Sequence, residues 1–419
     1  MNKKKIISFC VFITGLILSG CSSSPKFTSN GDDNFPYRTN SGYRNSYSIR
    51  VLMNGPASSF TWTAEEKITV YIEDKRSAIV NPGNELIFTP DDNDVNLVIS
   101  GREFSGTSIR LISEDEDGII KFNRKDFRGS IKIISNDNLL TVVNSLSLED
   151  YLKGVLPLEM PSGRGDENFE ALKAMAVCAR TYSINKIGEN KPSFDVYLDT
   201  RDQVYGGMSS EKDITNKAID ETSGMILTFD GKPAITFYSA SCGGHTEDVK
   251  NVFSYVNSDI PYLKGVKDGE EPYCSITPRF EWEENYSYET IINRLRSAGL
   301  VTGSDISLEN IEVVSRFESG RVNELKIELS VDDDDRSISI FSNQIRSVIR
   351  TANDSGILRS TMFDITQEGD SIKIWGRGYG HGVGLCQWGT IYLSHEGWNY
   401  KSILEHYFPG TDIKRFKND

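Results

Sequence analysis

One glutamate differs from the other acidic residues in its immediate surroundings. Glu159 is flanked by Leu158 and Met160, and Pro157 and Pro161 enclose this tripeptide. Because proline restricts the backbone on either side, we expect the tripeptide at a helix end or in a short rigid loop. Partial loss of water raises the pKa of a carboxyl group, and a protonated carboxylic acid can donate a proton to a leaving oxygen. Glu159 is therefore a candidate general acid. A solvated surface glutamate is the alternative, since the chain has 60 acidic side chains.

A glycine-rich segment, Gly376–Gly384, carries glycine at every second position. The dinucleotide pattern G-x-G-x-x-G fails in every register, and no Lys-Ser/Thr follows to make a phosphate loop. Alternating glycines instead allow backbone N–H groups to approach a ligand closely. His381, Gln387 and Trp388 would add a titratable ring, an amide and a stacking face, which are typical of sugar sites. A purely structural turn is the alternative.

A third candidate site lies in the segment 237–247. Cys242 and His245 are three residues apart and Cys274 lies further on, so three soft ligands could meet at a zinc ion. The spacing matches no zinc finger and lacks a fourth ligand. A Cys242–Cys274 disulfide, a pair of free buried thiols and a catalytic Cys/His pair remain open.

The N-terminus has the features of an export signal. Three lysines precede the apolar run 6–18, and Leu-Ser-Gly then leads to Cys21. This ending resembles the lipobox of bacterial lipoproteins, which implies cleavage before Cys21 and acylation of its thiol. We predict a signal peptide over 1–20, a flexible tether over 21–45, and a membrane-anchored protein that faces the cell wall or periplasm. An ordinary signal peptide with an incidental cysteine is the alternative. Outside the cytoplasm the cysteines that remain would be expected to form disulfides, with a pairing that the sequence does not specify: Cys178, Cys242, Cys274 and Cys386.

The composition is that of a globular protein with an acidic surface. The chain has 419 residues and a net charge of −14. Nucleic acid is excluded as a partner because phosphate binding needs a basic face. Adhesion to anionic lipid through basic residues is excluded for the same reason.

Short strand-like runs and helical patterns indicate an α+β fold. The strand-like runs are 49–52, 67–72, 85–88, 96–99, 108–111, 130–134 and 139–143 in the first part, and 311–315, 324–329 and 372–375 later. A capping box opens a helix at Ser147, and further helices are expected over 167–187, 288–298, 342–352, 385–394 and 401–407. We divide the folded region 46–415 into a β-rich part (46–145), a catalytic core (146–285), an α/β insertion (286–370) and a final part with the glycine-rich loop (371–415).

Taken in order, several segments resemble the SpoIID/LytB family, the sporulation stage II protein D group. The matching stretches are 146–161 (LSLEDYLKGVLPLEMP), 170–182 (EALKAMAVCARTY), 203–207 (QVYGG), 237–247 and 378–389 (GYGHGVGLCQWG). The resemblance implies a lytic transglycosylase that cleaves peptidoglycan between N-acetylmuramic acid and N-acetylglucosamine and leaves 1,6-anhydro ends, with Glu159 as its single acid/base. It implies no required cofactor, with a structural zinc ion as an open alternative, and a preference for glycan stripped by a partner amidase.

The resemblance also implies residues of the substrate groove: Arg180, Tyr205, Ser239, His381 and Gln387. We expect a local basic patch that includes Arg180 or Arg377, because the glycan carries lactyl carboxylates. Cys386 and Tyr238 depart from the family pattern, which often has Ser or Met and sometimes His at these positions. A non-catalytic glycan-binding protein that stimulates an amidase is the second hypothesis. A zinc peptidase is disfavoured because H-E-x-x-H is absent.

Overall fold

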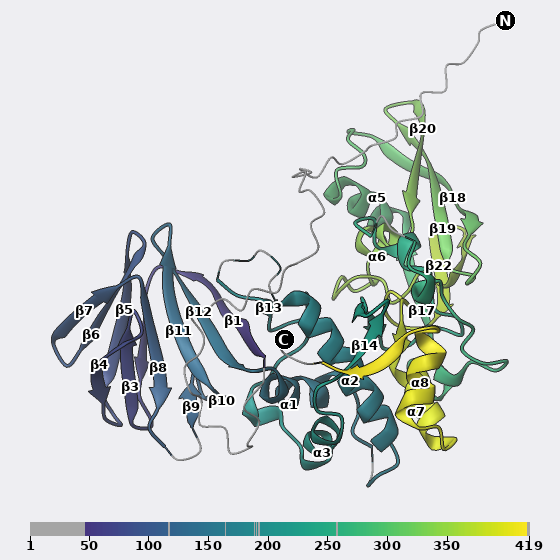
Figure 1. Cartoon of the computed structure of the whole chain (residues 1–419). Coiled ribbons are helices and arrows are strands. Elements are labelled where there is room, and N and C mark those ends of the chain that lie inside the picture. Colours follow the sequence, from purple (N-terminus) through teal and green to yellow (C-terminus); the bar gives the residue numbers. More distant parts are fainter. Residues whose placement is uncertain are drawn as a thin grey trace, which may run out of the picture. The chain divides into compact units, whose positions relative to one another are not determined.

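The structure is a computed structural model that describes residues 47–115, 118–163, 165–187, 189, 191, 193–256 and 259–416. The expected signal peptide, the tether and Cys21 lie outside these residues. Among the described residues, no helix has the length and apolar character needed to cross a bilayer. The chain divides into two compact units (Figure 1). The N-terminal unit comprises the described residues up to Thr236 together with the segment that begins at Asp412. The C-terminal unit runs from Phe237 to Thr411. Each unit is described by itself.

The N-terminal unit contains a seven-stranded sheet of order β13-β1-β12-β11-β8-β3-β4. Its strands are β1 (Ser48–Ala57), β3 (Ile68–Ile72), β4 (Lys75–Val80), β8 (Ser108–Ser113), β11 (Ser130–Asn136), β12 (Leu139–Ser147) and β13 (Val196–Tyr197). A four-stranded sheet contains β2 (Phe60–Thr63), β5 (Glu85–Asp91), β6 (Asp94–Ile99) and β7 (Arg102–Gly106), and β9 (Ile119–Phe122) pairs with β10 (Lys125–Arg128).

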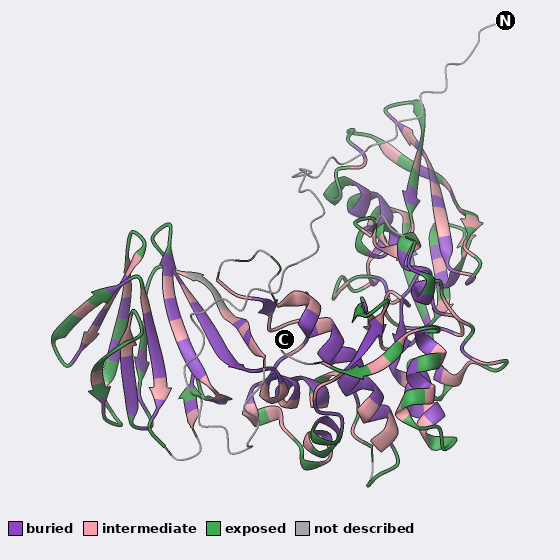
Figure 2. Cartoon of the chain, in the orientation of Figure 1, coloured by how far each residue is buried: buried purple, intermediate pink, exposed green. Residues whose placement is uncertain are grey.

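Alternation along these strands explains why they form sheets with one buried face. In β6, Val95, Leu97 and Ile99 are buried while the residues between them are half-buried, which is the period of two that a strand imposes. Asp137 and Asn138 have positive φ angles of 51° and 58° and form the two-residue turn between β11 and β12. Figure 2 shows buried residues distributed along the strands of this unit.

Helices complete the N-terminal unit and carry the glutamate singled out above. They are α1 (Leu148–Glu159), α2 (Phe169–Lys186) and α3 (Asp213–Glu221), with the 3-10 turn η1 (Met208–Ser210). A small sheet of β14 (Met225–Phe229), β15 (Lys232–Pro233) and β24 (Asp412–Arg415) brings the chain's C-terminal segment back to this unit. The helix α2 contacts α1, α3 and β14, and its alanines allow this close packing.

The C-terminal unit consists of three small sheets and short helices. Its strands are β16 (Tyr238–Ser239), β17 (Glu281–Ser287), β18 (Ile306–Arg316), β19 (Val322–Val331), β20 (Asp334–Phe341), β21 (Phe363–Glu368), β22 (Ser371–Arg377) and β23 (Leu385–Cys386). Its helices are α4 (Val249–Val252), α5 (Tyr288–Ser297), α6 (Gln344–Ile349), α7 (Gln387–His395) and α8 (Tyr400–Tyr407), with the 3-10 turns η2 (Pro261–Leu263) and η3 (Tyr273–Ile276). The strand orders are β17-β22-β21, β18-β19-β20 and a parallel β16-β23 pair.

The α+β fold class predicted from the sequence is confirmed. The structure adds elements that the sequence patterns left out, among them β17 and β20. The residues 281–287, for which no strand was predicted, form a strand whose alternate side chains Trp282, Glu284 and Tyr286 are buried. The helix expected over 342–352 is shorter, because Arg350 adopts a positive φ of 55° and ends it.

Candidate functional site

Glu159 is the last residue of α1, at the helix end that the flanking prolines predict. The N-cap residue Ser147 accepts a hydrogen bond from the N–H of Asp150 at 3.1 Å, which begins the helix. Met160 leaves the helix with extended backbone angles, as expected of a residue that precedes proline. The helix end therefore places the Glu159 carboxyl at a fixed point of the N-terminal unit.

The carboxyl of Glu159 is held by the loop that follows β13. The backbone N–H of Val204 donates to Glu159 Oε1 at 2.8 Å. Glu159 is half-buried, between the exposed Leu158 and the buried Met160. This surrounding is the partly dehydrated one expected from the sequence, and the bond from Val204 restricts the orientation of the carboxyl.

Buried hydrogen bonds fix the loop that contains Val204. Gln203 Oε1 accepts from Ser183 Oγ at 2.7 Å and from Tyr151 Oη at 3.3 Å. The Tyr205 hydroxyl donates to Asn144 Oδ1 at 2.8 Å, and the Tyr205 side chain is buried. Tyr205 therefore anchors the loop to the interior of the unit. Because its side chain is buried, we do not include Tyr205 among the residues that would touch a glycan.

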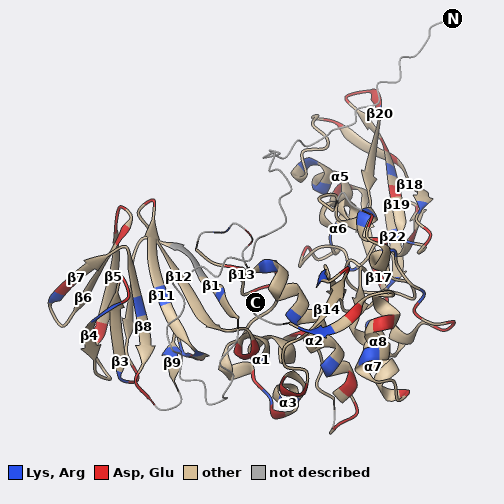
Figure 3. Cartoon of the chain, viewed as in Figure 1, with Lys and Arg blue, Asp and Glu red and all other residues tan. Residues whose placement is uncertain are grey.

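Arg180 is also an internal residue of the N-terminal unit. Only 1% of it is exposed, and its guanidinium forms a two-pronged ion pair with Glu149, at 2.8 Å from each carboxylate oxygen. Further N–H groups donate to the carbonyls of Met225 and Ile219. The guanidinium thus ties α2 to α1, α3 and β14. This placement does not fit the groove and basic-patch roles expected for Arg180. Lysines and arginines alternate with acidic residues along the elements of both units (Figure 3).

The glycine-rich loop belongs to the C-terminal unit and is held by its own backbone. The N–H of Gly382 donates to Ser239 Oγ at 3.2 Å, and the N–H of Val383 donates to His381 Nδ1 at 3.0 Å. Gly382 has a positive φ of 80°, and a Cβ there would lie 2.2 Å from a guanidinium nitrogen of Arg321. Ser239 thus lies against the backbone of the loop that carries His381. Gln387 is buried at the first position of α7.

His381 is a neutral ring rather than a positive charge. Loss of water around the ring, followed by the positive charges of Arg346 and Arg321, lowers the pKa of His381 to about 3. Its Nδ1 accepts a hydrogen bond, so the proton of the neutral ring is on Nε2. The ring packs edge-on against Phe253 with centroids 5.2 Å apart. At neutral pH His381 therefore supplies no cation.

This lowered pKa predicts a dependence of stability on pH. Between pH 6.5 and about 3 the unfolded chain binds a proton at His381 that the folded unit does not, so stability falls as the pH falls. We expect the slope to reach about 1.4 kcal/mol per pH unit within this window. Urea unfolding followed by tryptophan emission measures it, because all tryptophans except Trp62 lie in the C-terminal unit.

His381→Asn is the comparison variant, since its Oδ1 can accept the Val383 N–H without titrating. Its unfolding free energy is expected to depend less steeply on pH than that of the wild type. Parallel curves for the two proteins would contradict the assignment of a neutral ring.

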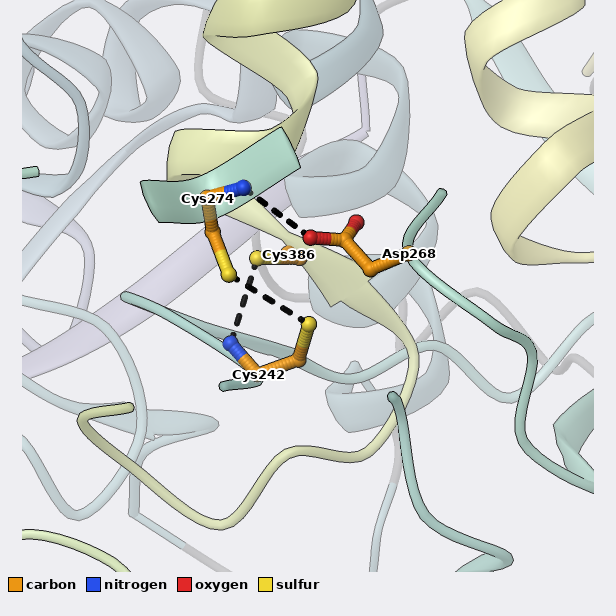
Figure 4. Close-up of side chains that lie close together, drawn as sticks. All are labelled: Cys242, Asp268, Cys274 and Cys386. Carbon is orange, nitrogen blue, oxygen red and sulfur yellow. Dashed lines mark hydrogen bonds between the residues drawn. The ribbon is translucent and has the colours of Figure 1, made fainter. Parts of the chain in front are cut away.

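Three cysteines and one aspartate meet inside the C-terminal unit (Figure 4). Their ligand atoms all lie within 4.8 Å of one another, and all four residues are buried: Cys242, Asp268, Cys274 and Cys386. Cys242 Sγ lies 3.7 Å from Cys274 Sγ, and the N–H of Cys242 donates to Cys386 Sγ at 3.2 Å. Burial, followed by the charge of Cys274, raises the pKa of Asp268 to about 8.

This cluster contains two of the three residues considered as zinc ligands from the sequence. Cys242 and Cys274 belong to it, whereas His245 does not: its Nδ1 lies 2.6 Å from the carbonyl of Thr246. Cys178 is buried in α2 of the other unit, and none of the four described cysteines forms a disulfide. Asp268 was not among the ligands predicted from the sequence, and Cys386 was predicted there as a disulfide former and a departure from the family motif, not as a metal ligand.

The candidate residues are divided between the units. Glu159, Arg180 and Tyr205 belong to the N-terminal unit, and Ser239, His381 and Gln387 to the C-terminal unit. The surroundings of Glu159 are thus described within the N-terminal unit, and those of the glycine-rich loop within the C-terminal unit.

Comparison with known proteins identifies what this chain is similar to. The family described as stage II sporulation protein (SpoIID) matches residues 136–229, and a domain of unknown function, DUF8618, matches residues 270–384.

An uncharacterised protein of Brachyspira hyodysenteriae is 32% identical over 374 residues, which cover 88% of this chain and 94% of that protein. The amidase enhancer of Bacillus subtilis is 30% identical over 299 residues, covering 63% of this chain and 40% of the enhancer. Stage II sporulation protein D of Bacillus subtilis is 28% identical over 288 residues, covering 65% and 75%. The SpoIID match contains α1 with Glu159, α2 and the Val204 loop.

Proposed function

Because the chain belongs to the SpoIID/LytB family, we propose that it is a peptidoglycan lytic transglycosylase in which Glu159 is the only acid/base group. The observation that carries this proposal is the environment of Glu159. The carboxyl ends a helix within the SpoIID match, is half-buried, and is oriented by the N–H of Val204 at 2.8 Å. A carboxyl with a restricted orientation in a partly dehydrated place suits proton transfer to a leaving oxygen.

A single carboxyl is sufficient for this reaction. Glu159 donates its proton to the glycosidic oxygen as the bond from this oxygen to C1 of N-acetylmuramic acid breaks. The 6-hydroxyl oxygen of the same sugar then bonds to C1, and its proton returns to the Glu159 carboxylate. The products are an N-acetylglucosamine end with a free hydroxyl and a 1,6-anhydro end, and no water is consumed. Hydrolases that place two carboxylates across the bond need a second acid residue.

The products of digestion test this proposal. Sacculi are stripped of stem peptides with an amidase and then incubated with the purified protein, and the released sugar ends are identified by mass spectrometry. We expect 1,6-anhydro ends. Reducing ends formed by hydrolysis, or no release at all, would overturn the transglycosylase assignment.

The similarity to a protein named amidase enhancer favours a second candidate function. In this reading the chain binds glycan without cleaving it and raises the rate of a cell-wall amidase. The same digestion separates the two functions when an amidase and the protein are added together. Faster release of stem peptides without anhydro ends would support the enhancer.

The proposed place of action is a membrane surface that faces the cell wall or the periplasm. We propose that residues 1–20 direct export and that Cys21 carries the lipid, on the strength of the basic, apolar and Leu-Ser-Gly-Cys segments. Cys21→Ser is expected to lose the incorporation of a labelled fatty acid that the wild type shows. Equal fatty-acid labelling of the two proteins would contradict acylation at Cys21.

A further inference from the structure

The distances within the cysteine cluster correspond to metal ligands. Two thiolates bound to one tetrahedral zinc ion at about 2.3 Å lie about 3.8 Å apart. The Sγ atoms of Cys242 and Cys274 are 3.7 Å apart, whereas a disulfide requires about 2.05 Å. With Cys386 and Asp268 the cluster offers four ligand atoms within 4.8 Å, which is the number that a structural zinc site uses.

Three segments far apart in the sequence deliver these ligands. The strands β16 and β23 pair in parallel with Ser239 opposite Cys386, which brings Cys242 beside Cys386. The turn η3 carries Cys274, and the preceding loop carries Asp268. Cys386 is also the N-cap residue of the nine-residue helix α7.

The carboxylate of Asp268 is already oriented by its neighbours. The hydroxyl of Tyr407 donates to Asp268 Oδ1 at 2.6 Å, and the N–H of Cys274 donates to Oδ2 at 3.0 Å. Gly389 leaves room for this arrangement, because a Cβ there would lie 2.1 Å from the Tyr407 hydroxyl. Bonds of this kind orient the ligands of metal sites and raise their affinity.

A buried arginine supplies an independent indication of negative charge. Arg321 is 1% exposed and donates from Nη2 to the carbonyl of Cys242 at 2.6 Å. Its Nε and Nη1 have no hydrogen-bond partner within the described part of the chain. A buried cation needs negative charge nearby, and the buried Glu247 supplies part of it. Three thiolates and a carboxylate around a divalent ion carry a net negative charge, which compensates this guanidinium.

We infer that one zinc ion is bound in a closed structural site by four ligands: Cys242, Asp268, Cys274 and Cys386. Four protein ligands leave no position for water, so the ion has no direct part in chemistry at a glycan. Instead it links β16, η3 and the start of α7. Because Cys386 follows Gly384 by two residues, the ion anchors the end of the glycine-rich loop.

Zinc content and affinity test this inference without an activity assay. The protein is purified under reducing conditions without chelator, its zinc is measured by elemental analysis, and its affinity is measured by competition with a chromophoric chelator. We expect about one zinc per chain, and a cobalt-substituted protein with the absorption of tetrahedral thiolate ligation. Zinc removal is expected to lower the melting temperature of the wild type.

Three variants assign the ligands. Cys386→Ser is expected to lose bound zinc, and Tyr407→Phe, which keeps every ligand, should weaken binding by about 10- to 100-fold. The matched control is Cys178→Ser, a buried thiol outside the cluster, which should keep full zinc content. A reduced wild type that binds neither zinc nor cobalt would overturn the inference, as would a Cys242–Cys274 disulfide in the native protein. Equal zinc loss in Cys178→Ser and Cys386→Ser would also count against it.

Discussion

Glu159→Gln should abolish the formation of 1,6-anhydro ends while leaving the protein folded. Removal of a general acid costs about 10²- to 10⁴-fold in rate, and this group is proposed to serve in both proton transfers. Glutamine has nearly the same shape, and its side-chain oxygen can still accept the N–H of Val204 that now lies 2.8 Å from Glu159. The loss of rate therefore reports the missing proton rather than a rearranged loop. The measurement is the initial rate of anhydro-end release from peptide-stripped glycan.

Glu65→Gln is the control for this substitution, because Glu65 is an exposed glutamate of the same unit. It removes one negative charge without touching the helix end, and we expect its rate to match that of the wild type. Unchanged far-ultraviolet circular dichroism and glycan binding in Glu159→Gln would complete the comparison. If Glu159→Gln released anhydro ends at the wild-type rate, Glu159 would not be the acid and the mechanism would have to be abandoned.

Local rules were sufficient to predict much of the fold from the sequence. The expected runs 85–88 and 96–99 lie within β5 and β6, because alternating apolar residues can bury only one face of a strand. The capping box at Ser147 and the proline after Met160 predicted both ends of α1. The strand β20 was missed because its first residues are acidic and exposed, and pairing with β19 decides its conformation.

The candidate site depends on contacts between distant segments, which a single sequence does not reveal. Cys242 and Cys386 are 144 residues apart and meet only because β16 and β23 pair. Asp268 had no local feature that distinguished it from the other acidic residues. Conversely, Arg180 and Tyr205 were predicted to bind ligand because of their residue types within the motifs. Both side chains are buried and stabilise the interior of the unit instead. Residue type within a motif therefore indicated importance without indicating exposure.

Arg180→Ala is expected to destabilise the N-terminal unit by about 3–5 kcal/mol, because it removes one partner of a buried ion pair. Glu149 would lose its two bonds of 2.8 Å and remain as a charge without its cation, and the carbonyls of Met225 and Ile219 would lose donors. Arg180→Lys restores the charge but lacks the planar fork, so we expect only partial recovery. Hydrogen–deuterium exchange of peptides from α1 and α2, followed across a urea series, reports this unit specifically.

The ion pair between Arg201 and Asp199 provides the matched control for this prediction. It has similar geometry, with nitrogen and oxygen 2.7 Å apart, but its side chains are 60% and 43% exposed. Because water already solvates both groups, Arg201→Ala should leave exchange in α1 and α2 nearly unchanged. The same guanidinium fork would then stabilise strongly where it is buried between helices and hardly at all where it is exposed. Equal effects of Arg180→Ala and Arg201→Ala would show that burial does not set the strength of the Arg180 pair.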